Sequence, residues 1–171
     1  VSRSNNPVQP AVFTIGSIHG GEVGNVIPAE VTLKGTLRTI SPDVRTRLLQ
    51  RVEEVLRGTT AAHGAEYDYR HRPGYPVLVN DPEMARLARA EAAAVVGAEQ
   101  VLPPAPTMGG EDMAYYQREV PGCYLWIGSA PEGGAYPHHN PRFDFDERAL
   151  GIAVEVMVRL ARRVLDGSTR P

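Results

Sequence analysis

The sequence is poor in cysteine, in net charge and in long apolar runs, and each deficit excludes a class of protein. Its single cysteine, Cys123, cannot form an internal disulfide, which favours a reducing cytoplasm. The net charge is only -2 and the 18 basic residues are scattered, so nothing favours binding to nucleic acid or an anionic membrane. No apolar run approaches the roughly 20 residues of a membrane span. We therefore expect a soluble cytoplasmic protein with no nucleic-acid or membrane partner.

The start of the sequence also lacks expected features. It begins at Val1 without methionine, and residues 1–7 show no charged-then-apolar pattern of a signal segment. The 171 residues are enough for one ordinary domain or two small ones. We expect the chain to be a piece of a longer polypeptide.

The first half of the chain predicts a small α+β module. Residues 12–18 are β-branched and aromatic and residues 31–38 alternate strictly, so both predict strands, the second with one buried face. Residues 41–62 open with Ser-Pro-Asp, a good helix start, and continue with apolar residues at helical spacing. Alternation over residues 67–72 predicts a third strand. These elements are most of a ferredoxin-like unit, whose leading strand and helix would precede the sequence.

The second half follows a break in composition. Residues 73–76 read Pro-Gly-Tyr-Pro, and we expect a domain boundary there, between domains 1–73 and 74–171. The pattern beyond it predicts a helix that Asp81 caps and Gly97 ends, a short helix at 113–116, a buried strand at 123–127 and an amphipathic helix from Asp146 to Gly167.

The loop at residues 136–141 concentrates the potential metal or acid–base chemistry. His138 and His139 are two of the five histidines and lie between prolines. Neutral imidazole is the commonest metal ligand, but adjacent side chains diverge, which favours one ligand and one bystander. The simpler interpretation is a pair of surface histidines, since no partner lies at a ligand spacing. The acids at residues 144–147 could add oxygen ligands or stabilise the start of the following helix.

Further polar groups are candidates for a site. Residues 109–112, Gly-Gly-Glu-Asp, combine a glycine turn with two carboxylates and could orient a ligand or simply begin a helix. His19 and Asn25 lie in a glycine-rich loop and could donate to a carboxylate or a developing oxyanion, or could only stabilise the loop. Arg38 ends a polar strand face and could bind a carboxylate through two hydrogen bonds, or be an ordinary exposed arginine.

Together these segments resemble the metal-dependent amidohydrolases of the aminoacylase, hippurate hydrolase and indole-acetyl-amino-acid hydrolase group, which are metallopeptidase-like. The segments that carry the resemblance follow the family's order and are residues 16–21, 25–28, 35–39, 108–116 and 138–144. The resemblance covers nearly the whole chain. It implies a mixed α/β and α+β fold, with a partial ferredoxin-like lid domain that dimerises, followed by the C-terminal part of an α/β metallopeptidase-like catalytic domain.

The resemblance also implies catalytic and metal-binding roles. The family holds two divalent metal ions per site, often zinc or manganese. His139, which stands directly before Asn-Pro, matches the last metal ligand, and His138 would then be a bystander. His19 matches a lid histidine that reaches across a homodimer and polarises the scissile carbonyl in the partner's site.

Substrate-binding roles follow from the same resemblance. Asn25 and Arg38 match lid positions that hold the substrate's carboxylate, and Glu111 and Asp112 match a catalytic-domain motif beside the metal centre, where Gly110 and Glu111 are expected to bind substrate. The implied reaction is hydrolysis of an N-acyl or aminoacyl amide bond by a metal-activated water, releasing an amino acid. The family's other metal ligands and its general-base glutamate would precede Val1, so the chain alone is expected to be inactive. The alternative is a non-catalytic derivative that retains the lid for dimerisation or small-ligand binding.

Overall fold

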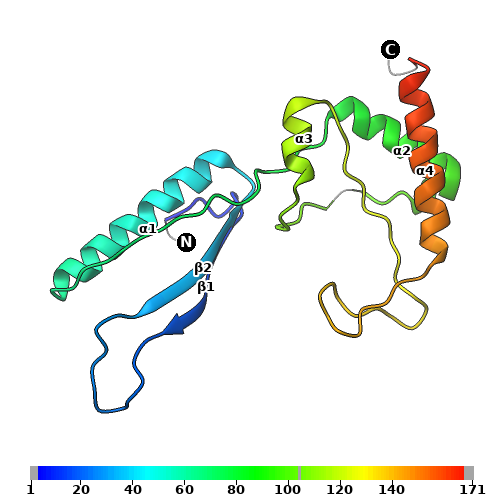
Figure 1. Ribbon diagram of the computed structural model, residues 1–171. Helices are drawn as coiled ribbons and strands as arrows, with labels where there is room; N and C mark the ends of the chain where they lie inside the picture. Colours follow the sequence, from blue (N-terminus) through cyan, green and yellow to red (C-terminus); the bar gives the residue numbers. More distant parts are fainter. Residues whose placement is uncertain (1–3, 104, 168–171) are drawn as a thin grey trace. The chain divides into compact units, whose positions relative to one another are not determined.

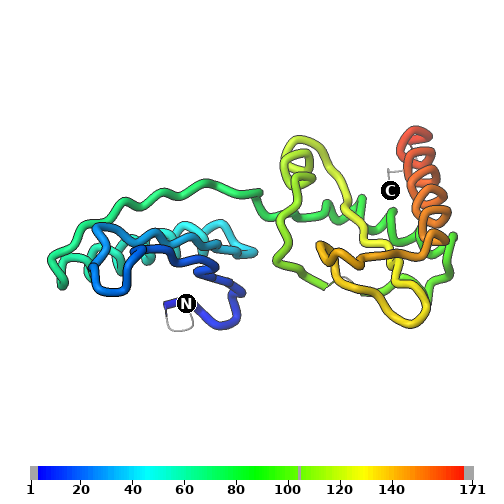
Figure 2. Tube along the Cα trace, turned by 60° about the horizontal axis from the view of Figure 1, so that its bottom comes forward, coloured from blue at the N-terminus to red at the C-terminus, as the bar shows by residue number. Residues whose placement is uncertain are grey.

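The computed structural model describes residues 4–103 and 105–167 (Figures 1 and 2). The chain forms two compact units, one of Val1–Val77 with Thr107–Asp112, the other of Leu78–Pro106 with Met113–Pro171. Helices and strands are both present, which agrees with a mixed α/β class. None of the helices in these described ranges is both long and apolar enough to cross a membrane.

The first unit contains a two-stranded antiparallel sheet. β1 (Ala11–His19) pairs with β2 (Thr32–Thr39), as the β-branched and alternating sequence predicts (Figure 1). The register shifts after Ile15, which pairs with Gly35. A Cβ on Gly35 would lie 2.3 Å from the carbonyl oxygen of Thr14. Only glycine therefore allows the two strands to approach at this point.

The helix of the first unit confirms its predicted start. α1 (Pro42–Ala62) follows Ser41, whose hydroxyl accepts a hydrogen bond from the Val44 N–H at 3.4 Å. α1 packs against β2 near this end. Val44 and Leu48 are only 2% and 4% exposed, so the first turns of the helix supply the buried apolar contacts of the unit.

The sheet is less covered than its sequence pattern predicts. Alternation over residues 31–38 predicts a buried face, but Val31 and Leu33 are 51% and 54% exposed. A two-stranded sheet cannot cover its own face, and α1 covers only part of it. The predicted third strand at residues 67–72 is wrong, because this segment has no neighbouring strand among the described residues with which to form a ladder. The ferredoxin-like arrangement remains a prediction.

The second unit is built around two packed helices. α2 (Pro82–Val96) begins after Asp81, whose carboxylate accepts a hydrogen bond from the Met84 N–H at 2.9 Å, and ends at Gly97. α4 (Arg148–Leu165) packs against α2. The buried apolar residues of the two helices are Leu87, Ala88, Ala149 and Val156. In α2 the capping residue therefore defines the helix start and apolar periodicity defines the packed face, as the sequence predicts, whereas α4 has no side-chain cap hydrogen bond.

Shorter elements complete the second unit. η1 (Ala98–Gln100) and α3 (Met113–Glu119) follow α2 along the chain. The predicted strand at residues 123–127 is wrong, because this segment forms no strand in the structure. The backbone of Tyr124 is hydrogen-bonded to the side chain of Asn80 instead of to a neighbouring strand. The amide of Asn80 donates to the Tyr124 carbonyl at 3.0 Å and its oxygen accepts from the Tyr124 N–H at 2.8 Å.

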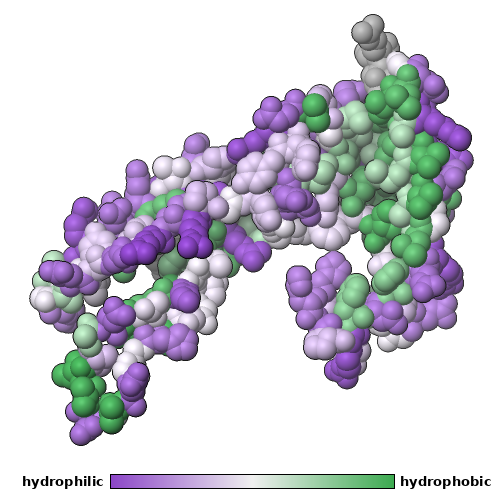
Figure 3. Space-filling model, viewed as in Figure 1, coloured by the Kyte–Doolittle hydropathy of each residue, from purple (hydrophilic) through white to green (hydrophobic). Residues whose placement is uncertain are grey.

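α4 also leaves an apolar stripe at the surface (Figure 3). Leu150, Val154 and Met157 are between 54% and 62% exposed. Exposed apolar patches of this kind mark surfaces that contact another polypeptide or a ligand. The buried residues Ala149 and Val156 lie about 100° around the helix from this stripe, and α4 packs on α2.

Candidate functional site

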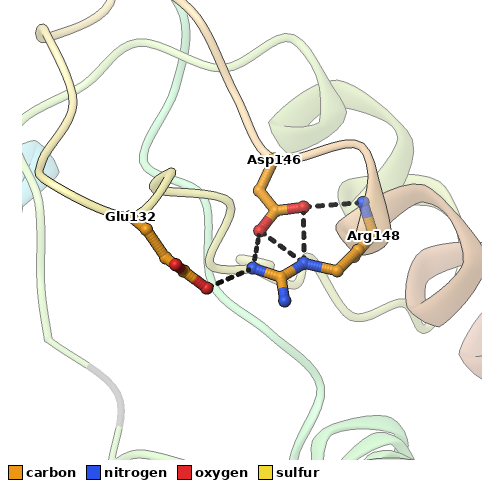
Figure 4. Close-up of polar contacts among 3 residues, drawn as sticks. All are labelled: Glu132, Asp146 and Arg148. Atoms are coloured by element: carbon orange, nitrogen blue, oxygen red, sulfur yellow. Dashed lines mark hydrogen bonds and ion pairs between the residues drawn. The ribbon is translucent and has the colours of Figure 1, made fainter.

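The loop that carries the two adjacent histidines is closed at its base. The Asp146 N–H donates to the Ser129 carbonyl at 2.8 Å. Nε of Arg148 donates to Oδ2 of Asp146 at 2.7 Å, and the same guanidinium reaches Oε1 of Glu132 at 3.3 Å (Figure 4). These hydrogen bonds from Arg148 hold the pKa of Asp146 below its usual value. We call residues 129–146 the His loop, and its two ends are tied together by these contacts.

A tight turn presents both histidines. The Asn140 N–H donates to the Pro137 carbonyl at 3.1 Å, which makes residues 137–140 a β-turn. His139 has φ of 69°, and among the described residues it alone has positive φ without being glycine. Positive φ at the third position defines a type II turn, where glycine or asparagine is usual. A side chain in this conformation costs about 1–2 kcal/mol, and such strain concentrates at functional sites.

The two histidines differ in their surroundings. The ring of His138 stacks on Trp126 with centroids 6.4 Å apart, and meets the ring of Phe143 edge-on at 5.1 Å. His139 is exposed and its side chain has no hydrogen bond, ion pair or ring contact within the described parts of the chain. Its imidazole nitrogens therefore remain available to a ligand.

The described residues do not form a complete metal site. Within 4–103 and 105–167 no group of three His, Cys, Asp or Glu side chains is placed to bind one ion. A zinc site needs about three protein ligands. Asp146 is engaged by Arg148, so it serves the start of α4 and the base of the His loop. His139 fits a metal only as one ligand, with the others supplied from outside the described residues.

Aromatic residues of the His loop form a surface beside the candidate ligand. An open hollow of about 360 Å³ is lined by Tyr136, His138 and Phe143, among others. The guanidinium carbon of Arg142 lies 4.0 Å from the centre of the Tyr136 ring. Sequence reasoning gave Trp126 and Phe143 no role. Phe143 is only a few residues from the histidines in the sequence, which could have indicated a contact. Nothing in the sequence indicates that Trp126 stacks on His138.

The other predicted catalytic histidine lies at the loop end of the hairpin. His19 ends β1 and pairs with Thr32. A Cβ on Gly20 would lie 2.7 Å from Cγ2 of Val31, so the chain needs glycine directly after His19. Asn25 lies in the connecting loop. His19 and Asn25 are both exposed, and neither side chain has a hydrogen-bond partner among the described residues.

The remaining predicted substrate residues gather elsewhere in the first unit. Arg38 pairs with Val12 in the sheet, and its Nη1 donates to the Met108 carbonyl at 2.7 Å. This bond joins Arg38 to the segment that carries Gly110 and Glu111. A guanidinium has five N–H donors, so one bond to a carbonyl leaves others for a carboxylate ligand.

His19 and Arg38 lie far apart along the sheet of a single chain. Seven residues of β1 separate His19 from Val12, the partner of Arg38, which is about 23 Å at the rise of a strand. The structure thus brings Arg38 close to the segment of Gly110 and Glu111, but not to His19.

Comparisons with known proteins identify what the chain is similar to. Residues 4–163 match peptidase family M20/M25/M40. The chain is 39% identical over 163 residues to the putative amidohydrolase YhaA of Bacillus subtilis, covering 94% of this chain and 41% of the relative. It is 38% identical over 168 residues to the N-acetyl-L-cysteine deacetylase of the same organism, covering 98% and 39%. The chain therefore spans well under half the length of these relatives.

A solved structure shares the fold. The Bacillus subtilis YXEP protein, described as a dinuclear metal-binding peptidase from the M20 family, has a TM-score of 0.77 and 34% identity. The match covers 91% of this chain and 42% of the YXEP chain. At this identity and coverage the likeness extends over almost all elements described above.

Proposed function

Since the chain belongs to peptidase family M20/M25/M40, we propose that it is the C-terminal portion of a metal-dependent amidohydrolase. The substrate class is an N-acyl amino acid, and the reaction releases the free amino acid. The relatives named as an amidohydrolase and as an N-acetyl-L-cysteine deacetylase support this reaction class. The observation that carries the proposal is the positive φ of His139, an exposed imidazole in a turn position that glycine would occupy at lower cost.

Each predicted residue then has a task. His139 would be one ligand of a centre of two divalent ions, zinc or manganese, whose chemistry when bound is to activate the attacking water. Arg38 would pair with the substrate's carboxylate beside Gly110 and Glu111, where its guanidinium already contacts the backbone. His19 would donate to the oxygen on which negative charge develops.

The separation along the sheet supports a role for His19 in a second subunit's site. The distance of about 23 Å along β1 keeps His19 away from Arg38 of the same chain. We therefore propose a homodimer through the first unit, in which His19 and Asn25 reach the partner's site. The loop end of the hairpin has the exposed apolar surface that such a contact needs, since Ile18 and Ile27 are 64% and 93% exposed.

The test is a hydrolysis assay on the native protein, whether that is this chain or a longer polypeptide containing it. We expect metal-dependent release of amino acid from a panel of N-acetyl amino acids, abolished by a chelator and restored by zinc or manganese. His139→Asn keeps a residue that tolerates positive φ but lacks the imidazole. We expect His139→Asn to lower metal affinity by more than the roughly 10–100-fold loss that is typical when a residue that only orients a ligand is replaced. A metal-loaded native protein that hydrolyses none of the panel contradicts the proposal.

The non-catalytic alternative has one observation in its favour, the lack of a three-ligand group within the described residues. Intact mass and metal content of the native protein separate the two proposals. A dimer of this chain's length that binds N-acyl amino acids without metal supports the alternative. A protein about twice as long, as the coverage of its relatives suggests, with stoichiometric metal supports the hydrolase.

A further inference from the structure

We propose that the exposed apolar stripe of α4 and the unpaired edge of residues 123–127 are both covered, in the native protein, by the part of its polypeptide that lies outside these 171 residues. Both features belong to the second unit. The inference rests on the proposed function in one respect, because it takes the chain to be a portion of a longer polypeptide. It requires neither a metal ion nor catalytic activity.

α4 is apolar on two faces. The first face contains Ala149 and Val156, which are buried, and α4 packs on α2. The second face is exposed and runs the length of the helix, because apolar residues recur on it every three or four positions (Figure 3). Its members are Leu150, Val154, Met157, Ala161 and Leu165. A helix face that stays in water normally carries polar and charged residues, so this composition indicates a face that is covered in the native protein.

The second unit buries too little to form a core of its own. Among its described residues five are buried, and three of these are the alanines Ala88, Ala114 and Ala149. A self-sufficient domain buries more than half of the surface that its unfolded chain exposes, mostly through large apolar side chains. The stripe on α4 supplies such side chains, and a further layer of polypeptide against it would complete the core.

Residues 123–127 have one occupied edge and one unpaired edge. The N–H and the carbonyl of Tyr124 both bond to the side chain of Asn80, so they point to the same side, as in an extended residue. In an extended segment the peptide groups of the neighbouring residues point to the other side. Within the described parts of the chain the backbone groups of Cys123 and Leu125 have no hydrogen bond. Such an edge is suited to pair with another strand.

The relatives indicate the occupant. Their matches cover 94% and 98% of this chain but 41% and 39% of the relatives, so about three-fifths of each relative lies outside the match. The family match runs to residue 163 and therefore includes most of α4. A polypeptide of that length can supply both an apolar face for α4 and a strand for residues 123–127. The competing occupant is a second copy of the chain, whose contact would depend on protein concentration.

Cysteine labelling of the native protein tests the stripe. Val154→Cys places a thiol on the stripe, and Glu155→Cys places one at the adjacent polar position. Val154 is 62% exposed and the side chain of Glu155 is 53% exposed, so the two thiols would label similarly on an uncovered helix. We expect a maleimide to label Val154→Cys at least about tenfold more slowly than Glu155→Cys, because labelling of a covered thiol requires local opening. Mass spectrometry of the peptide that contains both positions measures the rates.

The unfolded variants provide the control, since both should label at the same rate in denaturant. Equal rates in the folded native protein overturn the inference. Slow labelling of Val154→Cys that is lost on dilution identifies a second copy as the occupant and also overturns it. A native protein no longer than these 171 residues has the same consequence.

Two measurements on the unmodified native protein need no substitution. Met157 is 60% exposed and Met84 is half-buried, yet we expect hydrogen peroxide to oxidise Met157 more slowly if the stripe is covered. The amides of Cys123 and Leu125 should show exchange protection factors above about 100 if a strand pairs with them. Faster oxidation of Met157, or protection factors near one, overturns the inference. Hydrolysis of N-acyl amino acids without this protection leaves the proposed function standing, whereas protection without hydrolysis supports the inference and contradicts the proposed function.

Discussion

The His loop is held in place by several side-chain and backbone contacts, whereas among the described residues the hairpin end that carries His19 is held by strand pairing and one turn hydrogen bond. The His loop has a hydrogen bond and ion pairs at its base, a closed turn, and ring contacts around His138. At the hairpin end, the one turn hydrogen bond joins the Val26 N–H to the Val23 carbonyl at 3.2 Å. The first arrangement can orient a ligand without help, and the second requires another surface to orient its histidine.

The difference follows from the chemistry of the two segments. The His loop contains aromatic rings and charged side chains that find partners within the loop or just outside its ends, at Trp126 and Arg148. The hairpin end contains glycines that permit close approach, and apolar side chains that remain exposed, Val26 and Ile27 at 60% and 93%. A site built from both would therefore combine a preorganised metal ligand with a group that becomes ordered on assembly.

The largest expected effect comes from mixing two inactive variants. His19→Ala removes the group proposed to act in the partner's site, and His139→Asn removes a ligand of the chain's own site. Each homodimer should be nearly inactive. If His19 acts across the interface, mixed dimers contain one intact site, and random pairing restores up to about a quarter of wild-type activity. The rate of N-acyl amino acid hydrolysis after unfolding and refolding the mixture measures this.

The controls for mixing come from the same proteins. Each variant refolded alone gives the background rate, and co-purification of differently tagged subunits shows how completely they exchange. Mixing that restores no activity despite complete exchange shows that His19 acts within its own chain, and the separation from Arg38 along β1 would then have to be bridged by movement of the hairpin.

The next largest effect concerns the strand pairing on which His19 depends. Gly35→Ala places a Cβ 2.3 Å from the Thr14 carbonyl oxygen, so the strands must separate. We expect a loss of about 1–3 kcal/mol in unfolding free energy, typical of overpacking. Gly16→Ala is the matched control in the same sheet, because a Cβ there has no atom within 4 Å. Urea unfolding measures both variants, and equal stabilities would contradict the close approach seen at Gly35.

Much of the fold could be predicted because its signals are local. Ser41 and Asp81 precede their helices with the cap chemistry expected of them, and both accept the hydrogen bond from the third residue of the helix. The two segments wrongly predicted as strands, residues 67–72 and 123–127, have good alternation or apolar composition. A strand also needs a neighbouring strand, and no local pattern specifies one. At residues 123–127 the neighbour is the side chain of Asn80, which periodicity cannot reveal.

The candidate site was only partly predictable for a similar reason. The position of His139 before Asn-Pro is readable from the sequence, whereas its positive φ and the stacking of His138 on Trp126 depend on the folded turn. The link from Arg148 to Glu132 joins residues far apart in sequence. The sequence shows Asp146 and Arg148 near the start of α4, but it does not indicate that these two residues close the His loop.

A smaller effect is expected at low pH, at the base of the His loop. Arg148 lowers the pKa of Asp146 in the folded chain, so this tie is fully present above the ordinary carboxyl pKa of about 4 and is lost as the pH falls through the lowered value. We expect the amide-exchange protection factors of Phe143 and Asp146, which correct for the intrinsic pH dependence of exchange, to fall over that range. Asp146→Asn lacks the tie at every pH and should show a flatter profile. Identical pH profiles in the two proteins would show that Asp146 does not stabilise the His loop.

The smallest effect on folding, and the sharpest test of the contrast between the two regions, is expected from Ile27→Ser. Ile27 is 93% exposed, so the substitution should change the unfolding free energy of the chain by less than about 0.5 kcal/mol. Val8→Ser, at a site 80% exposed in the same unit, is the matched control. If the hairpin end is buried between subunits, Ile27→Ser should weaken dimerisation by at least about tenfold, since a buried aliphatic side chain contributes about 1.5–3 kcal/mol and a homodimer loses it from both subunits. Sedimentation at several concentrations measures this. Equal association of the two variants would mean that the loop end of the hairpin stays exposed, and that His19 is oriented by something other than a second subunit.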